Sequence, residues 1–147
     1  MQALALPPWF GLALMGAVCG AALWKGGWEE RSVAFGLLFA WIATLLLRDP
    51  RWIGPQWGAF SADVALLVFL GVVAMRTTRY WPLFAAGFHL LAVVTHSARM
   101  LDPTMGAWAY ATAAVIWAHL VIISLAVGTW NHWREETRAQ VSAASGS

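Results

Sequence analysis

Four side chains in the central and C-terminal parts of the chain are of the types that bind headgroups or ions, or that pass on a proton. They are Asp63, His96, Arg99 and Tyr110. His96 and Arg99 are three positions apart and therefore share one face of a helix. A carboxylate beside an imidazole and a guanidinium stays ionised and orients the ring. These residues are the candidate ligand-binding or proton-relay site, and the competing interpretation is a salt bridge that only ties two helices together.

Two further histidines, His89 and His119, are expected near the middle of two neighbouring helices. Two imidazoles at one level can ligate a b-type haem through their Nε2 atoms. His96 follows His89 by seven positions and lies on the same face, but the position level with it on the next helix is Thr112. Hydrogen bonding between helices is the commoner use of such histidines. Haem or quinone is therefore kept as an alternative cofactor.

Other chemistries find no support in the sequence. It contains no glycine-rich phosphate loop, no GxSxG elbow, no HExxH motif and no pair of carboxylates within one apolar run. Cys19 is the single cysteine, which excludes an internal disulfide and a cysteine-based metal site. We predict no metal site and no catalytic residue, and we do not predict an enzyme.

The elements that must position these groups are membrane-spanning helices. Of the 147 residues, 61% are hydrophobic and 11% are charged, whereas a soluble domain carries roughly 25% charged residues. Charges separate apolar runs, each near the ~20 residues that cross a bilayer. The expected spans are residues 8–24, 32–47, 59–75, 80–98 and 106–130. The sequence thus predicts an all-α integral membrane bundle of about five transmembrane helices over residues 1–133, followed by a polar, frayed cytoplasmic tail over 134–147.

Aromatic and basic residues indicate how the bundle lies in the membrane. Nine of the 11 tryptophans fall at the ends of the expected spans, as in the aromatic belts of membrane proteins. An N-terminus outside places most of the basic residues on the cytoplasmic side, namely Lys25, Arg31, Arg76, Arg79, Arg134 and Arg138. The outer side then holds Arg48, Arg51 and Arg99. We expect the protein in a bacterial inner membrane, and the positive-inside rule predicts an N-terminus outside and a cytoplasmic C-terminus.

Small residues predict where helices approach one another. The first span carries Gly16-x-x-x-Gly20, a spacing that lets two helix backbones come close in lipid. We expect this face to pack inside the bundle.

Two segments carry a resemblance. Arg79-Tyr80-Trp81-Pro82 and Thr95-His96-Ser97-Ala98-Arg99 resemble segments of small, uncharacterised multi-spanning bacterial inner-membrane proteins, over roughly the last three spans. That resemblance implies no activity, cofactor or catalytic residue. Length, tryptophan content and span number also resemble the TspO-type sensory proteins. Pro7-Pro8-Trp9 precedes the first span instead of following it, so we do not assign the chain to them.

Three functions fit these features. The first is a non-enzymatic accessory or scaffold subunit of a larger membrane assembly, which short loops and small-residue helix faces favour. The second is a redox subunit that binds b-type haem or quinone. The third is a small oligomeric transporter or proton pathway. The expected partners are membrane lipids and other membrane-protein subunits or further copies of the chain. A net charge of +2 without a basic stripe predicts no nucleic-acid partner.

Overall fold

The computed structural model describes residues 8–47, 57–102 and 104–145 of the chain. Every element in these ranges is an α-helix, which confirms the predicted fold class. The five helices are α1 (Pro8–Lys25), α2 (Trp28–Leu47), α3 (Trp57–Arg76), α4 (Trp81–Leu101) and α5 (Ala107–Ser145). Arg48 and Arg51, which enter the predicted charge distribution, lie outside the described residues.

The surface of the bundle is apolar. Helices α2, α3, α4 and α5 are each long and apolar enough to cross a membrane, and α1 is a shorter apolar helix. Large hydrophobic side chains such as Phe39, Leu46 and Met75 stand on the outside of the described residues. Because water would penalise so much exposed apolar surface, hydrocarbon is the solvent that suits this face. By length and composition these four helices are thus compatible with a multi-pass membrane protein, and the fifth span remains a prediction for α1.

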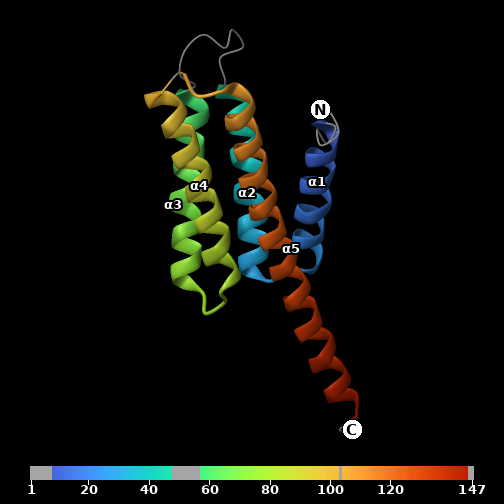
Figure 1. Cartoon of the computed structure of the whole chain (residues 1–147). Coiled ribbons are helices and arrows are strands. Elements are labelled where there is room, and N and C mark those ends of the chain that lie inside the picture. Colours follow the sequence, from blue (N-terminus) through green and yellow to red (C-terminus); the bar gives the residue numbers. More distant parts are fainter. Residues whose placement is uncertain (1–7, 48–56, 103, 146–147) are drawn as a thin grey trace.

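Helices that follow one another in the sequence pack side by side, and α5 also packs against α1 and α2. α3 packs on α2 and α4, α4 packs most extensively on α5, and α1 packs on α2 and α5. Figure 1 shows α3 and α4 side by side, with α1 at the opposite edge and α5 running obliquely between them. We call the end where α4 gives way to α5 the Asp102 end. The end where α1 turns into α2, and α3 into α4, is the Gly27 end.

The first turn of α2 lies further upstream than the predicted span. The helix begins at Trp28, four residues before the expected start, and takes in Glu29, Glu30 and Arg31. The Glu30 carboxylate reaches back to accept a hydrogen bond from the N–H of Gly27 at 2.9 Å. This is half of a capping box, in which the third helical residue satisfies a free backbone donor at the helix start. Charges that we expected in a loop therefore belong to the helix.

The last helix is also longer than predicted. α5 continues without a break through Ser145, so the expected frayed tail is wrong for residues 134–145. In Figure 1 this extension projects beyond the other helices at the Gly27 end. Its side chains from Trp133 onward are exposed on all sides.

Close approach between helices occurs at other glycines than the predicted pair. A Cβ built on Gly128 of α5 would lie 2.5 Å from Cε2 of Trp81, so α5 needs a glycine where it crosses this ring. Gly16 and Gly20 instead have no atom of the described residues within 4 Å of such a Cβ. The Gly16-x-x-x-Gly20 face is thus turned outward, and the expectation that it packs inside the bundle was wrong.

Candidate functional site

Three of the four predicted site residues meet near the Asp102 end of the bundle. Asp63 of α3, His96 of α4 and Tyr110 of α5 form a chain that we call the outer triad. His96 Nε2 lies 3.3 Å from Oδ2 of Asp63, and its Nδ1 lies 2.9 Å from the hydroxyl of Tyr110. The side chains of His96 and Asp63 keep 25% and 20% of their surface exposed. The outer triad is therefore partly reachable from outside the bundle.

The connection between α4 and α5 sets the register that brings Tyr110 to His96. Asp102 N–H closes the last turn of α4 on Ala98, and Met105 N–H donates to the Asp102 carbonyl. The Asp102 carboxylate accepts from the backbone N–H and the hydroxyl of Thr104, as acidic residues do in tight turns. The hydroxyl of Thr104, and then its N–H, hold the pKa of the Asp102 carboxyl below its ordinary value.

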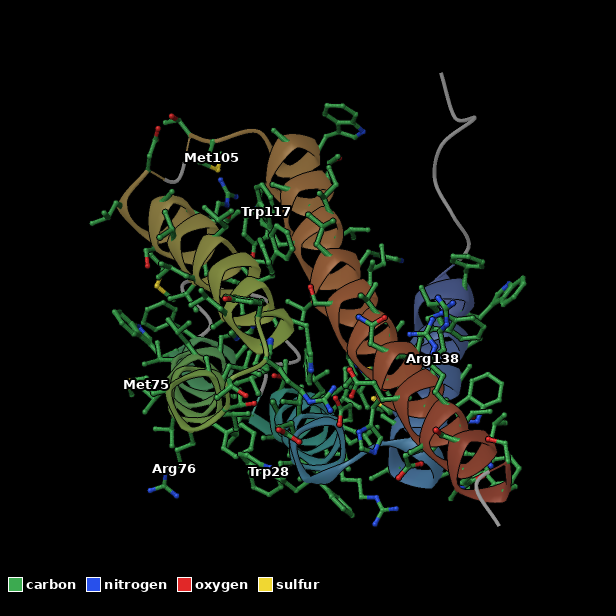
Figure 2. The ribbon with its side chains drawn as sticks, turned by 90° about the horizontal axis from the view of Figure 1, so that it is seen from below. Trp28, Met75, Arg76, Met105, Trp117 and Arg138 are labelled. Carbon is green, nitrogen blue, oxygen red and sulfur yellow. The ribbon has the colours of Figure 1, made fainter. Side chains whose placement is uncertain are left out.

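Arg99, the fourth predicted residue, takes part in this connection. Its Nη1 donates to the carbonyl of Met105 at 2.6 Å. Arg99 thus supports the turn that positions Tyr110, in addition to lying one helical turn from His96. Trp117 fastens the same pair of helices further along, because its Nε1 donates to the Thr95 hydroxyl at 3.1 Å. Figure 2 shows this indole between α4 and α5.

If Asp63 is ionised, the contacts of the outer triad assign the protons of its members. An ionised Asp63 only accepts, so His96 donates to it from Nε2. The neutral imidazole then has its lone pair on Nδ1, where it accepts from the phenol of Tyr110. A phenol, an imidazole and a carboxylate linked in this order can store a proton and pass it along the chain. Both ring nitrogens of His96 are occupied, so no lone pair is left for a metal.

The two predicted haem ligands face different helices. His89 is buried, and its Nε2 donates to the backbone carbonyl of Asp63 at 3.0 Å, across the α3–α4 contact. His119 lies against α1, where a Cβ on Gly11 would be 3.7 Å from its Cε1. Its Nδ1 donates to the Val115 carbonyl at 2.7 Å. The structure therefore does not bring His89 and His119 to one haem site.

One atom of this set has no partner. His119 Nε2 is buried and makes no hydrogen bond among the described residues. Because Nδ1 carries the proton that it donates to Val115, Nε2 holds the ring's free lone pair. No group of three His, Cys, Asp or Glu side chains within the described ranges could hold a metal ion.

A second polar cluster, at the Gly27 end, escaped the sequence analysis. Glu30 has no exposed surface, and its two carboxylate oxygens accept from Trp81 Nε1 at 3.0 Å and from Gly27 N–H. Trp81 is one of the nine tryptophans that we expected in the aromatic belts. In the structure it is instead a core residue of α4. The sequence indicates a helix start here only in part, because Gly27 can serve as an N-cap with Glu30 three residues later, and it does not show that the Glu30 carboxylate is buried.

Arg79 joins the other groups of this cluster. Its Nη2 donates to Glu135 at 2.8 Å and lies 3.4 Å from His132 Nδ1, and its Nε lies 3.8 Å from Glu29. His132 Nε2 in turn lies 3.3 Å from Glu136. The cluster links α2, the α3–α4 turn and α5. We call it the inner network and include Glu29, Glu30, Thr77, Arg79, Trp81, His132, Glu135 and Glu136.

The layer between the two polar clusters is mostly apolar, although it contains the buried imidazole of His89, whose Nε2 donates to the Asp63 carbonyl. Its buried side chains include Val33, Leu66, Leu70, Ala85 and Leu125. The buried hydroxyls of Ser124 and Thr129 donate to carbonyls of their own helix, four residues back. The described side chains therefore form no polar chain that connects the outer triad with the inner network.

The outside of α2 and α3 is hollowed by a groove of about 660 Å³. It is lined by small residues of both helices, Gly36, Ala43 and Ala65 among them, and by phenylalanine rings. Ser32 is the one hydroxyl-bearing residue that lines it. Such a groove suits an apolar occupant and offers no group for acid–base chemistry.

Comparison with known proteins adds no relative to this description. No family model matches the chain, and no match was found among the curated proteins or the solved structures.

Proposed function

We propose that the protein is a non-enzymatic accessory or scaffold subunit of a larger bacterial inner-membrane assembly. The observation that carries the proposal is that both polar clusters join side chains of different helices. In the outer triad and the inner network, the donors and acceptors are bound to other helices of the same bundle. Polar groups used in this way fix the mutual positions of the helices. The mostly apolar layer between the clusters also favours a structural subunit over a conducting one.

The charge distribution supports an orientation for this subunit. Lys25, Arg31, Arg76, Arg134 and Arg138 are exposed at the Gly27 end. We therefore place the Gly27 end and the helical extension of α5 in the cytoplasm.

We place a transmembrane helix of the partner subunit in the α2–α3 groove. In lipid, helices associate where small residues let their backbones approach, and such residues of two adjacent helices line the groove. The lining residues carry no charge that a partner helix would have to neutralise.

Filling the groove tests this proposal. Ala65 of α3 is exposed and lines the groove, so Ala65→Phe should leave the bundle folded while it blocks the partner. We expect the tagged wild-type chain, extracted gently from its native membrane, to appear by native mass spectrometry in a complex with other membrane polypeptides. The variant should lose at least about 1.4 kcal/mol of association, a tenfold weaker complex.

Val68→Phe is the matched control, because Val68 is exposed on the same helix and does not line the groove. It should retain the complex. A wild-type chain that is monomeric in mild detergent would contradict the proposed function. A complex of identical chains, or one that Ala65→Phe leaves intact, would contradict the partner helix in the groove.

One observation favours a second candidate, a proton-handling site at the outer triad. His96 links a phenol and a carboxylate through its two ring nitrogens, and the site is partly exposed. If this is the function, Asp63→Asn should reduce proton uptake into proteoliposomes to the level of protein-free vesicles, because the amide cannot hold the transferred proton. A pH-sensitive dye inside the vesicles measures the uptake.

Asp102→Asn provides the control, because Asp102 is an exposed carboxylate outside the triad and the amide oxygen of asparagine can still accept the hydrogen bonds from Thr104. It should leave uptake unchanged. Equal uptake by wild type and Asp63→Asn would remove this candidate and leave the outer triad as a tie between α3, α4 and α5.

A further inference from the structure

Acidic and basic side chains at the Gly27 end differ in whether they are paired. Glu29 and Glu30 are buried, and Glu135 and Glu136 pair with Arg79 and His132. These four acidic side chains therefore have their hydrogen-bond or ion-pair partners within the inner network or at its Gly27 backbone.

Five basic side chains remain outside the network, and we call them the basic rim. They are Lys25, Arg31, Arg76, Arg134 and Arg138, and all are exposed. Within the described ranges none of them pairs with a carboxylate. They come from the end of α1, the start of α2, the end of α3 and the extension of α5. Figure 2, which views the bundle from this end, shows Arg76 pointing away from the helices.

The basic rim lies beside exposed aromatic residues at the same end. The aromatic belt here consists of Trp24, Trp28, Tyr80, Trp130 and Trp133. Lys25 Nζ stands 4.9 Å from the centre of the Trp24 ring, so cation and indole are presented together. His132 of α5 packs against Gly27, which places Arg134 close to the level of the α1–α2 turn. Tryptophan and tyrosine lie at the headgroup level of a bilayer, so the basic rim lies there too.

We propose that the basic rim and this aromatic belt together bind the headgroups of anionic phospholipids. Unpaired cations at headgroup depth attract negatively charged lipid, whereas the indole rings hold the same lipids by their apolar contacts. The chemistry requires the phosphate to belong to a lipid, because a free anion gains nothing from the belt. This inference does not depend on the partner subunit proposed above.

Charge-removing and charge-keeping variants separate this role from a structural one. Arg31, Arg76 and Arg134 have no partner within the described ranges, so a triple change to Gln or to Lys should leave the fold intact. Each basic side chain near an anionic surface adds roughly fivefold to binding. The triple Gln variant should therefore bind phosphatidylglycerol roughly a hundredfold more weakly than wild type, and the triple Lys variant should bind it about as tightly.

The experiment titrates the detergent-solubilised protein with phosphatidylglycerol. Native mass spectrometry counts the bound lipids, and the rise in melting temperature measures the stabilisation. Phosphatidylcholine and inorganic phosphate are the comparison ligands. Phosphatidylglycerol should bind wild type far better than either, and high salt should weaken it. Equal stabilisation by phosphatidylcholine or by phosphate would overturn the proposal. Equal binding of phosphatidylglycerol by the triple Gln and triple Lys variants would also overturn it. If a variant fails to fold, the wild type alone decides, because binding that high salt does not weaken would contradict the proposal.

Discussion

Replacing Glu30 with alanine should lower the free energy of unfolding by about 2–4 kcal/mol. The change removes the acceptor of two hydrogen bonds, from Trp81 Nε1 and from Gly27 N–H. A buried donor left without a partner costs about 1–3 kcal/mol, and Trp81 is buried in the core. Unfolding of the protein in detergent, followed by circular dichroism during denaturant titration, gives the change in free energy.

Glu136→Ala is the control for this loss. Glu136 is a largely exposed carboxylate that pairs with His132, and a surface pair of this kind contributes at most about 1 kcal/mol. A double-mutant cycle with Trp81→Phe isolates the Glu30–Trp81 hydrogen bond, because phenylalanine removes the donor together with the need for an acceptor. If Glu30→Ala costs no more than Glu136→Ala, the carboxylate is not the buried acceptor that the structure shows.

Glu30 also shows why part of the structure could not be predicted from the sequence. The sequence analysis located the helices from uncharged runs, so charges at the end of a run were assigned to loops. In the structure, Glu29 and Glu30 form the first turn of α2 and point into the bundle. A charge at the membrane boundary can face either lipid headgroups or neighbouring helices, and the composition of the run does not distinguish the two.

The outer triad was predictable because it depends on depth. A helix rises about 1.5 Å per residue, so counting along two hairpins places Asp63, His96 and Tyr110 at one level. The rotation of each helix about its own axis, in contrast, could not be predicted from the sequence. In lipid the outward and inward faces are both apolar, so hydrophobic periodicity does not mark the buried side. For this reason the directions of His89, His119 and the Gly16-x-x-x-Gly20 face could not be derived.

The packing of α5 on α4 depends on such a rotation, and Gly128 is where it can be tested. A methyl group there would lie 2.5 Å from Cε2 and 2.6 Å from Nε1 of Trp81. The ring cannot move aside easily, because it is buried and donates to Glu30. Gly128→Ala should therefore push α5 away from α4 and cost about 1–3 kcal/mol of unfolding free energy, the usual range for overpacking a core.

Gly87→Ala on α4 is the matched control, since no described atom lies within 4 Å of a Cβ at that position. Alanine forms helix better than glycine by about 1 kcal/mol, so this variant should be neutral or more stable, and the two substitutions should shift the melting temperature in opposite directions. Trp81→Phe shortens the ring and removes its hydrogen bond to Glu30, so the ring can move away from the new methyl group, and it should recover part of the loss in the double variant. If Gly128→Ala leaves the melting temperature unchanged or raises it, as expected for Gly87→Ala, then α5 does not cross α4 at this ring. Gly128 would then not be the contact that holds Trp81 against Glu30.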